Sequence, residues 1–130
     1  MSSLKFRSDV TTRTVTLLEK ASKLAETSVY RHRHGAIIMK NGKIVSTGIN
    51  RAVNNPFQVE FPKLQAGLHA EVAALNACRK TDLRGATIYV ARVARDGSQV
   101  MSKPCINCQK ALIARGVKKV YYTIDGEMDL

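Results

Sequence analysis

The feature that most constrains the fold is a histidine and a cysteine pair, far apart in the sequence, each at the expected start of a helix. His69 opens the segment HAEVAALNACRK, and Cys105 and Cys108 follow Pro104 at the start of CINCQKALIAR. Cysteines three residues apart at the start of a helix lie on one face of it. If one metal ion joins them to His69, both helices must point their N-termini at the same place.

The cysteine pair has other interpretations. A thioredoxin-like redox pair usually follows the first strand of its fold, whereas Cys105 and Cys108 follow the third predicted strand. A structural zinc site needs four protein ligands. Cys78 lies about 13 Å along the helix axis from His69, too far to share its metal, and we expect it in the core. A catalytic zinc site needs only three protein ligands and keeps one position for water, which His69, Cys105 and Cys108 satisfy.

An acidic residue accompanies the predicted metal site. Glu71 lies two residues after His69 and would sit beside the open position. There it could take a proton from water and pass it to a leaving group. The positive ends of two helix dipoles would favour thiolates at the same place. We therefore predict Glu71 as the catalytic acid–base.

The chain shows no repeat or linker, which indicates a single domain over residues 1–130. Apolar spacing predicts a helix over 12–27. Asn41-Gly42 between two β-rich runs predicts a hairpin with a type I′ turn. The remaining elements, in chain order, are a surface loop over 50–68, a helix over 69–80, a strand over 85–93, a helix over 105–115 and a strand over 117–124. The last two strands flank a helix, so they should be parallel in an α/β fold.

Composition limits the partners. The formal net charge of +11 suits nucleotide phosphates, nucleic acid or other anions. Few aromatic residues and no Trp argue against a long platform for stacked bases. No segment resembles a signal peptide or a membrane span, and the three cysteines favour a reducing compartment. We expect a cytoplasmic protein with no membrane partner.

The motif HAE followed by PCINC resembles the zinc-dependent cytidine and deoxycytidylate deaminase superfamily. The resemblance implies a three-layer α/β/α sandwich with a mixed central sheet. Because the chain ends at DGEMDL, we expect the fifth strand of many relatives to be short or absent. The resemblance also implies Zn²⁺ as cofactor, with ligands His69, Cys105 and Cys108, and Glu71 as proton shuttle.

The same resemblance implies substrate contacts. Asn50 would contact the sugar, the backbone of Ala70 the base carbonyl, and the carbonyl of Lys103 the departing amine. Gly35 and Ala36 would line the base pocket. If the substrate carries a phosphate, His32 and His34 could touch it, and the best candidates to bind it are Arg31, Arg33, His34 and Arg51.

The implied activity is hydrolytic deamination of a cytosine nucleoside or nucleotide to its uracil form, with release of ammonia. One alternative is a deaminase acting on cytosine or adenosine in single-stranded nucleic acid or tRNA. The other is a non-catalytic zinc module that binds nucleic acid, although Glu71 argues against it. Relatives form dimers or tetramers, so we expect a homo-oligomer.

Overall fold

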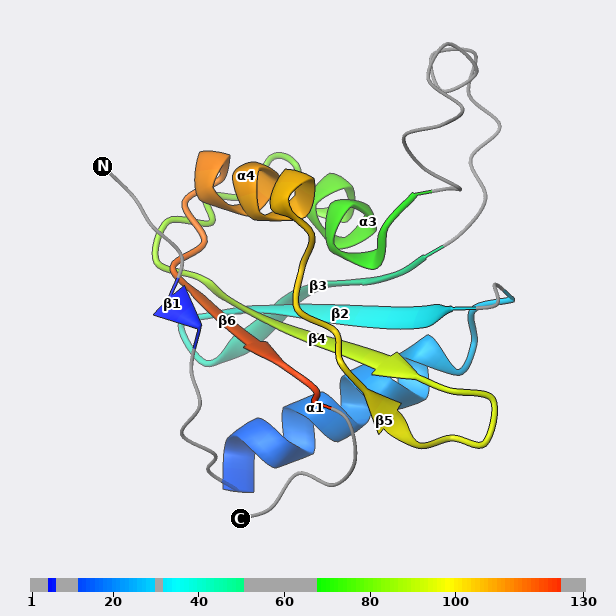
Figure 1. The fold of residues 1–130 in the computed structure, drawn as a ribbon. Helices are drawn as coiled ribbons and strands as arrows, with labels where there is room; N and C mark the ends of the chain where they lie inside the picture. The colour runs from blue at the N-terminus through cyan, green and yellow to red at the C-terminus, as the bar shows by residue number, and fades with distance from the viewer. Residues whose placement is uncertain (1–4, 7–11, 30–31, 51–67, 125–130) are drawn as a thin grey trace, which may run out of the picture.

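A computed structural model describes residues 5–6, 12–29, 32–50 and 68–124. Its centre is a mixed sheet in the order β1-β6-β4-β2-β3, with β5 paired to β4 (Figure 1). The strands are β1 (Lys5–Phe6), β2 (Arg33–Lys40), β3 (Lys43–Ile49), β4 (Thr87–Val93), β5 (Gln99–Val100) and β6 (Lys119–Tyr122). Strand β6 runs parallel to β4 and β1, and the other pairs are antiparallel. The predicted parallel pairing of the two strands around the last helix is confirmed.

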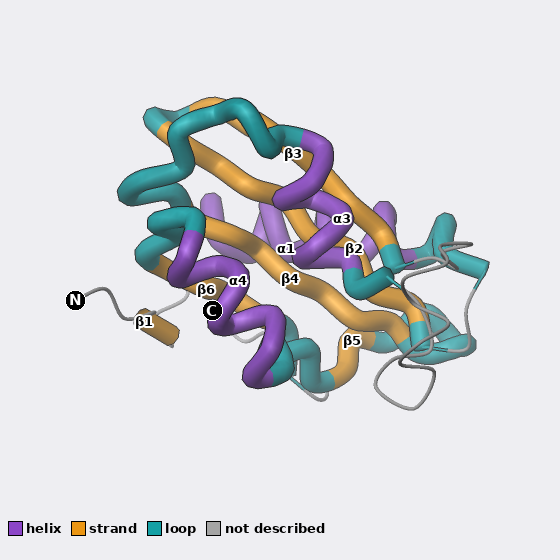
Figure 2. The backbone as a smooth tube through the Cα atoms, turned by 90° about the horizontal axis from the view of Figure 1, so that it is seen from above, coloured by secondary structure: helices purple, strands orange, loops and turns teal. Residues whose placement is uncertain are grey.

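Three helices in the described part of the chain cover the two faces of this sheet. Helix α1 (Thr12–Ala25) lies on one face, and α3 (Ala70–Ala77) and α4 (Ile106–Ala114) lie together on the other (Figures 1 and 2). The predicted three-layer α/β/α sandwich with a mixed sheet is therefore confirmed. Since α3 and α4 share a face, residues at their starts can reach each other.

The core is divided by the alternation of side chains along the strands. Ala36, Ile38, Ile88 and Val90 pack with α3 and α4 in one cluster. The residues between them pack with α1 in a second cluster, which holds Ile37, Met39, Tyr89 and Ala91. Tyr89 stacks on Tyr121 in that second layer, with ring centroids 5.0 Å apart. Even-numbered residues of β2 and β4 thus face α3 and α4, and odd-numbered residues face α1.

The predicted hairpin is confirmed. Asn41 and Gly42 join β2 to β3 with φ values of 52° and 77°. Positive φ at both central positions is what a type I′ turn requires, and Asn-Gly adopts it at low cost.

Glycine allows α3 to approach the sheet closely. A Cβ atom added to Gly48 on β3 would lie 2.5 Å from both the carbonyl oxygen of Ala70 and the amide nitrogen of Ala74. The hydroxyl of Ser46, two residues earlier on the same strand, donates to the carbonyl of Ala74 at 2.6 Å. These contacts set the height and direction of α3, and hence the place where the helix begins.

Several boundaries differ from the sequence predictions. Helix α3 ends at Ala77 instead of residue 80, because the chain turns at Cys78, whose N–H donates to the Leu75 carbonyl. The two short strands β1 and β5 were not predicted. Within the described part of the chain no strand follows β6, and β1 pairs with its outer edge. The predicted loop lies outside the described residues except at its two ends, as do residues 125–130.

Candidate metal centre and active site

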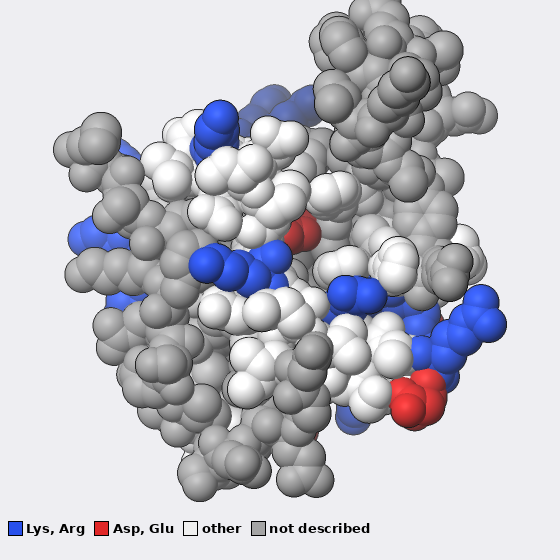
Figure 3. Space-filling view, in the orientation of Figure 1, with Lys and Arg blue, Asp and Glu red and all other residues white. Residues whose placement is uncertain are grey.

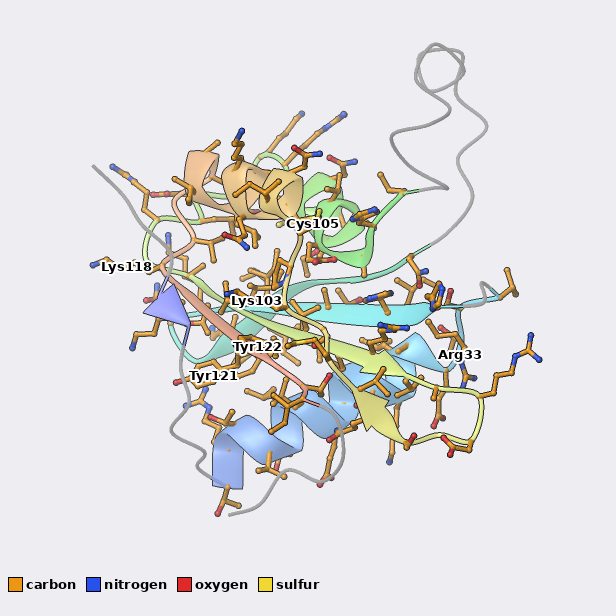
Figure 4. The ribbon with its side chains drawn as sticks, in the orientation of Figure 1. Arg33, Lys103, Cys105, Lys118, Tyr121 and Tyr122 are labelled. Carbon is orange, nitrogen blue, oxygen red and sulfur yellow. The ribbon has the colours of Figure 1, made fainter. Side chains whose placement is uncertain are left out.

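Both predicted groups of metal ligands stand at helix starts. His69 is the N-cap residue of α3 and Cys105 the N-cap residue of α4, each with extended backbone angles. The Cys105 thiol accepts from the N–H of Cys108 at 3.5 Å, as an N-cap side chain does. Figure 4 shows Cys105 at the start of α4, next to α3. The helix starts therefore meet, as the sequence predicts.

The ligand atoms themselves converge. The Nδ1 atom of His69 lies 3.2 Å from the Sγ of Cys108 and 3.7 Å from the Sγ of Cys105. All three atoms lie within 4.8 Å of one another. A tetrahedral zinc ion with bonds of about 2.0 Å to nitrogen and 2.3 Å to sulfur would separate those atoms by roughly 3.6 Å. The donor set and its spacing therefore fit zinc.

The centre is open on one side. Cys108 is buried, His69 is half-buried and Cys105 is exposed. Burial raises the pKa of the Cys108 thiol, and the neighbouring Glu71 carboxylate raises it further. A buried thiol needs a nearby cation to lose its proton, which a bound metal would supply.

Glu71 is buried beside these ligands, with 4% of its surface exposed. Burial raises the pKa of its carboxyl group, while its own backbone N–H, the nearby His69 and a hydrogen bond with Cys108 lower it. A carboxyl group whose pKa is raised can hold and release a proton nearer neutral pH, as a general acid–base must. The catalytic role of Glu71 itself stays a prediction.

The segment before Cys105 is held by a serine that sequence inspection missed. The hydroxyl of Ser102 donates to the Val90 carbonyl on β4 and accepts from the N–H of Thr123, both at 2.8 Å. The Ser102 N–H donates to the Thr123 carbonyl at 3.0 Å. These bonds anchor the connection to α4, so the cysteine pair is fixed relative to the sheet. The sequence has no local signal for this role.

Asn50 is buried at the end of β3, and its amide clamps the start of β2. Its Nδ2 donates to the His32 carbonyl at 2.5 Å, and its Oδ1 accepts from the N–H of His34 at 2.8 Å. The Ser28 hydroxyl donates to the Asn50 carbonyl. These hydrogen bonds within the protein are enough to account for a buried asparagine at position 50. Its contact with a substrate sugar stays a prediction.

The other predicted substrate contacts do not all lie on the side of the metal centre. Ala70 is buried as the first residue of α3, directly after His69. Lys103 lies exposed on the connection from β5 to α4 (Figure 4). Ala36 packs on the α3 side of the sheet, whereas a Cβ on Gly35 would enter the backbone of α1 on the opposite side. Close packing of α1 thus accounts for glycine at position 35, and its part in a base pocket stays a prediction.

Of the predicted phosphate ligands, Arg31 and Arg51 lie outside the described residues. Arg33 donates to the Ala94 carbonyl at 2.5 Å. Burial lowers the pKa of His34 to about 4, which leaves that imidazole neutral at physiological pH. Neither Arg33 nor His34 is therefore well suited to bind a phosphate.

With the geometry in place, comparison with known proteins identifies the family. The profile of the cytidine and deoxycytidylate deaminase zinc-binding region matches residues 11–124. The chain belongs to the cytidine and deoxycytidylate deaminase family. Family membership makes it a zinc-dependent deaminase, and zinc is the cofactor predicted from the sequence. The non-catalytic alternative is thereby excluded.

Among curated members of this deaminase family, the deoxycytidylate deaminase of Mycobacterium phage D29 is 28% identical over 110 residues, covering 71% of this chain and 78% of that protein. The riboflavin biosynthesis protein RibD of Actinobacillus pleuropneumoniae is 34% identical over 93 residues, covering 67% of this chain but 19% of RibD.

Solved structures agree with this assignment. The dCMP deaminase of cyanophage S-TIM5 in its apo form superimposes with a TM-score of 0.65 at 27% identity, covering 87% of this chain and 84% of that one. The same phage enzyme in complex with dCMP and dUMP gives a TM-score of 0.61 at 25% identity, covering 88% and 83%. In the described part of this chain, no helix has the length and apolar character needed to cross a bilayer.

Proposed function

We propose that this deaminase hydrolyses a cytosine nucleotide to the corresponding uracil nucleotide and ammonia. The observation that carries the proposal is the meeting of His69, Cys105 and Cys108 beside the buried carboxyl group of Glu71. The two phage relatives, both named deoxycytidylate or dCMP deaminases, favour a nucleotide over a nucleoside. The net charge of +11 favours an anionic substrate in the same way.

In this proposal His69, Cys105 and Cys108 hold the zinc ion. When bound, zinc lowers the pKa of water and so supplies a nucleophile at neutral pH. Addition of water at C4 of the cytosine ring forms a C–O bond, and loss of the exocyclic amine then breaks the C–N bond. No oxidant or reductant is needed.

Glu71 moves the protons in both halves of this reaction. It accepts a proton from water and delivers it to N3 of the ring, then carries a second proton to the departing amine. The backbone N–H of Ala70 would bind the base carbonyl, and the Lys103 carbonyl would accept from the leaving ammonia. Asn50 would bind the sugar, through the donor and acceptor positions that its clamp on β2 leaves over.

The test is a substrate panel with the zinc-loaded protein. Release of ammonia and the absorbance change from cytosine to uracil are followed with dCMP, CMP, deoxycytidine, cytidine and a single-stranded oligonucleotide. We expect turnover of a mononucleotide, lost in Glu71→Gln. Turnover of the oligonucleotide alone, with an affinity that falls steeply as salt rises, would instead favour the polymer-directed alternative.

A further inference from the structure

We propose that a basic depression at the end of β4 binds the phosphate group of the substrate, with Arg92 as its principal ligand. This inference rests on the proposed deamination of a cytosine nucleotide, and it names the residues that would distinguish nucleotide from nucleoside. His32 and Arg95 line the same depression together with Val93 and Ala94, and its volume is about 370 Å³.

Arg92 lies on the face of the sheet that carries the metal centre. Side chains alternate along a strand, and Ile88 and Val90 of β4 both pack in the cluster beneath α3 and α4. Arg92 is the next residue on that side. Its paired residue on the neighbouring strand β2 is His34, which lies two residues before Ala36 and so faces the same side of the sheet. The side chains of Arg92 and His34 therefore emerge on the face from which His69 and the cysteines approach.

Arg92 also lies at the correct end of this face. Along β3, Ser46 contacts Ala74 and Gly48 contacts Ala70. Helix α3 is therefore antiparallel to β3, and its first residue lies nearest the end of β3 that leads to Asn50. Gly48 pairs with Ala36, which pairs with Val90 across the sheet. The start of α3 thus stands over the row of Val90.

Continuing in the same direction beyond that row places Arg92 next to the metal centre. On the face that carries α3 and α4, the next positions beyond this row are Arg92 and His34. They lie on the side toward which the chain extends from Ala70 back to His69. Consistent with this placement, Arg92 and His69 are both near enough to His34 to contribute, after burial, to the lowering of its pKa. A nucleotide carries its phosphate beyond its sugar, so a phosphate site must lie beside the centre that holds the base and not within it.

The depression is electropositive, and its arginine and histidine side chains can donate hydrogen bonds. An Arg92 guanidinium nitrogen lies 2.9 Å from Nδ1 of His32. Because a guanidinium can only donate, this imidazole nitrogen accepts, and the neutral ring then carries its hydrogen on Nε2 as a further donor. No described carboxylate forms an ion pair with Arg92. Asp96, near the same turn, is already held by the N–H and hydroxyl of Ser98.

The surface view agrees with this charge distribution. Figure 3 shows basic side chains over this end of the sheet, with acidic side chains beside them and at the centre of the face. An arginine held by a neighbouring imidazole is pre-oriented for the two parallel hydrogen bonds that guanidinium and phosphate form. The site therefore matches a phosphate monoester.

The experiment compares ligands that differ only in the phosphate. Binding of dUMP and of deoxyuridine to the zinc-loaded protein is measured by calorimetry for the wild type, Arg92→Gln and Arg79→Gln. Arg79 is an exposed arginine after the end of α3, so its replacement removes the same charge elsewhere. For Arg92→Gln we expect dUMP affinity to fall by about tenfold to a hundredfold and deoxyuridine affinity to stay unchanged. Arg79→Gln should change neither.

Zinc content and thermal unfolding verify that Arg92→Gln is folded, and His32→Ala gives a second, milder test that should weaken dUMP by a smaller factor. Equal dUMP affinity in the wild type and Arg92→Gln would overturn the proposal. So would an equal loss of affinity for deoxyuridine, which lacks the phosphate. If no cytosine compound is deaminated but dUMP binding still depends on Arg92, the proposed function fails and the phosphate site stands.

Discussion

The Nδ1 atom of His69 lies 3.2 Å from the Sγ of Cys108, although 39 positions separate these residues in the chain. Each residue belongs to the first turn or cap of its helix, and the two helices pack side by side on one face of the sheet. The metal centre therefore depends on the packing of both helices against the strands, and the predictions below test that dependence.

Zinc content is the first prediction. We expect about one zinc ion per chain in protein purified without chelator, because three ligands with thiolate character suffice for a catalytic site. Cys105→Ser and Cys108→Ser should lose the metal, as measured by elemental analysis. Cys78→Ser is the matched control, since this buried thiol donates to the Ala74 carbonyl on the far part of α3. A folded and active protein without metal would contradict the assignment.

Replacing Glu71 should separate chemistry from metal binding. Glu71→Gln keeps the shape of the side chain but cannot carry a proton. We expect zinc to stay bound while kcat falls by roughly 10²-fold to 10⁴-fold, the usual loss for a general acid–base. Steady-state kinetics with parallel metal analysis measures both. Loss of zinc together with the carboxylate would mean that Glu71 is a ligand.

Two glycines offer a test of helix position. Gly48→Ala would push α3 from the sheet, and Gly35→Ala would push α1 from the other face. Both should lower the free energy of unfolding, by roughly 1–3 kcal/mol as overpacking does. Only Gly48→Ala should also weaken zinc, because His69 begins α3. Denaturant unfolding and competition with a chelator give the two readouts, and equal zinc affinity in both variants would count against the prediction.

His34 should make the fold sensitive to acid. Burial lowers its pKa to about 4 in the folded protein, whereas an unfolded histidine titrates near 6.5. Between these values the unfolded state binds more protons, so stability falls as the pH drops from about 6.5 to 4. The contribution is up to about 3 kcal/mol. His34→Gln should lose less stability than the wild type over this range in denaturant unfolding.

The oligomeric state is a further prediction. Met101 and Ile106 are exposed at 48% and 62%, and Ile124 at 47%. The bond from the Ser102 N–H to the Thr123 carbonyl brings Met101 and Ile124 close together. Apolar side chains grouped in this way are typical of interfaces. We expect a homodimer or homotetramer, and light scattering that gives a monomer mass at micromolar concentration would refute this.

Much of the fold is readable from local sequence. Asn41-Gly42 predicts its hairpin because few residues accept positive φ, and the apolar spacing of 12–27 predicts α1. The grouping of His69, Cys105 and Cys108 is predictable because zinc is bound by only a few types of side chain. In each case a short-range physical requirement leaves a pattern in the chain.

The rest depends on long-range packing. Strands β1 and β5 are two residues long, too short to show an alternation, although Asp96-Gly97 between β4 and β5 is a pair of residues that favours a hairpin turn. The role proposed for Arg92 requires knowing which face of β4 lies under α3. Whether the even-numbered or the odd-numbered residues of β4 face α3 is set by the packing of Ala36 and Val90, which composition alone does not reveal.

The pairing of β1 with β6 has a consequence for the order of folding. Lys5 aligns with Lys119, so nearly the whole chain forms the loop that this contact closes. Closing such a loop costs more entropy than any other pairing in the sheet, and only two residues on each strand repay it. Strand β1 should thus join last and detach first. In native-state hydrogen exchange, the amide protons that bridge β1 and β6 should have much lower protection factors than those between β2 and β4. The metal centre should stay intact when β1 detaches.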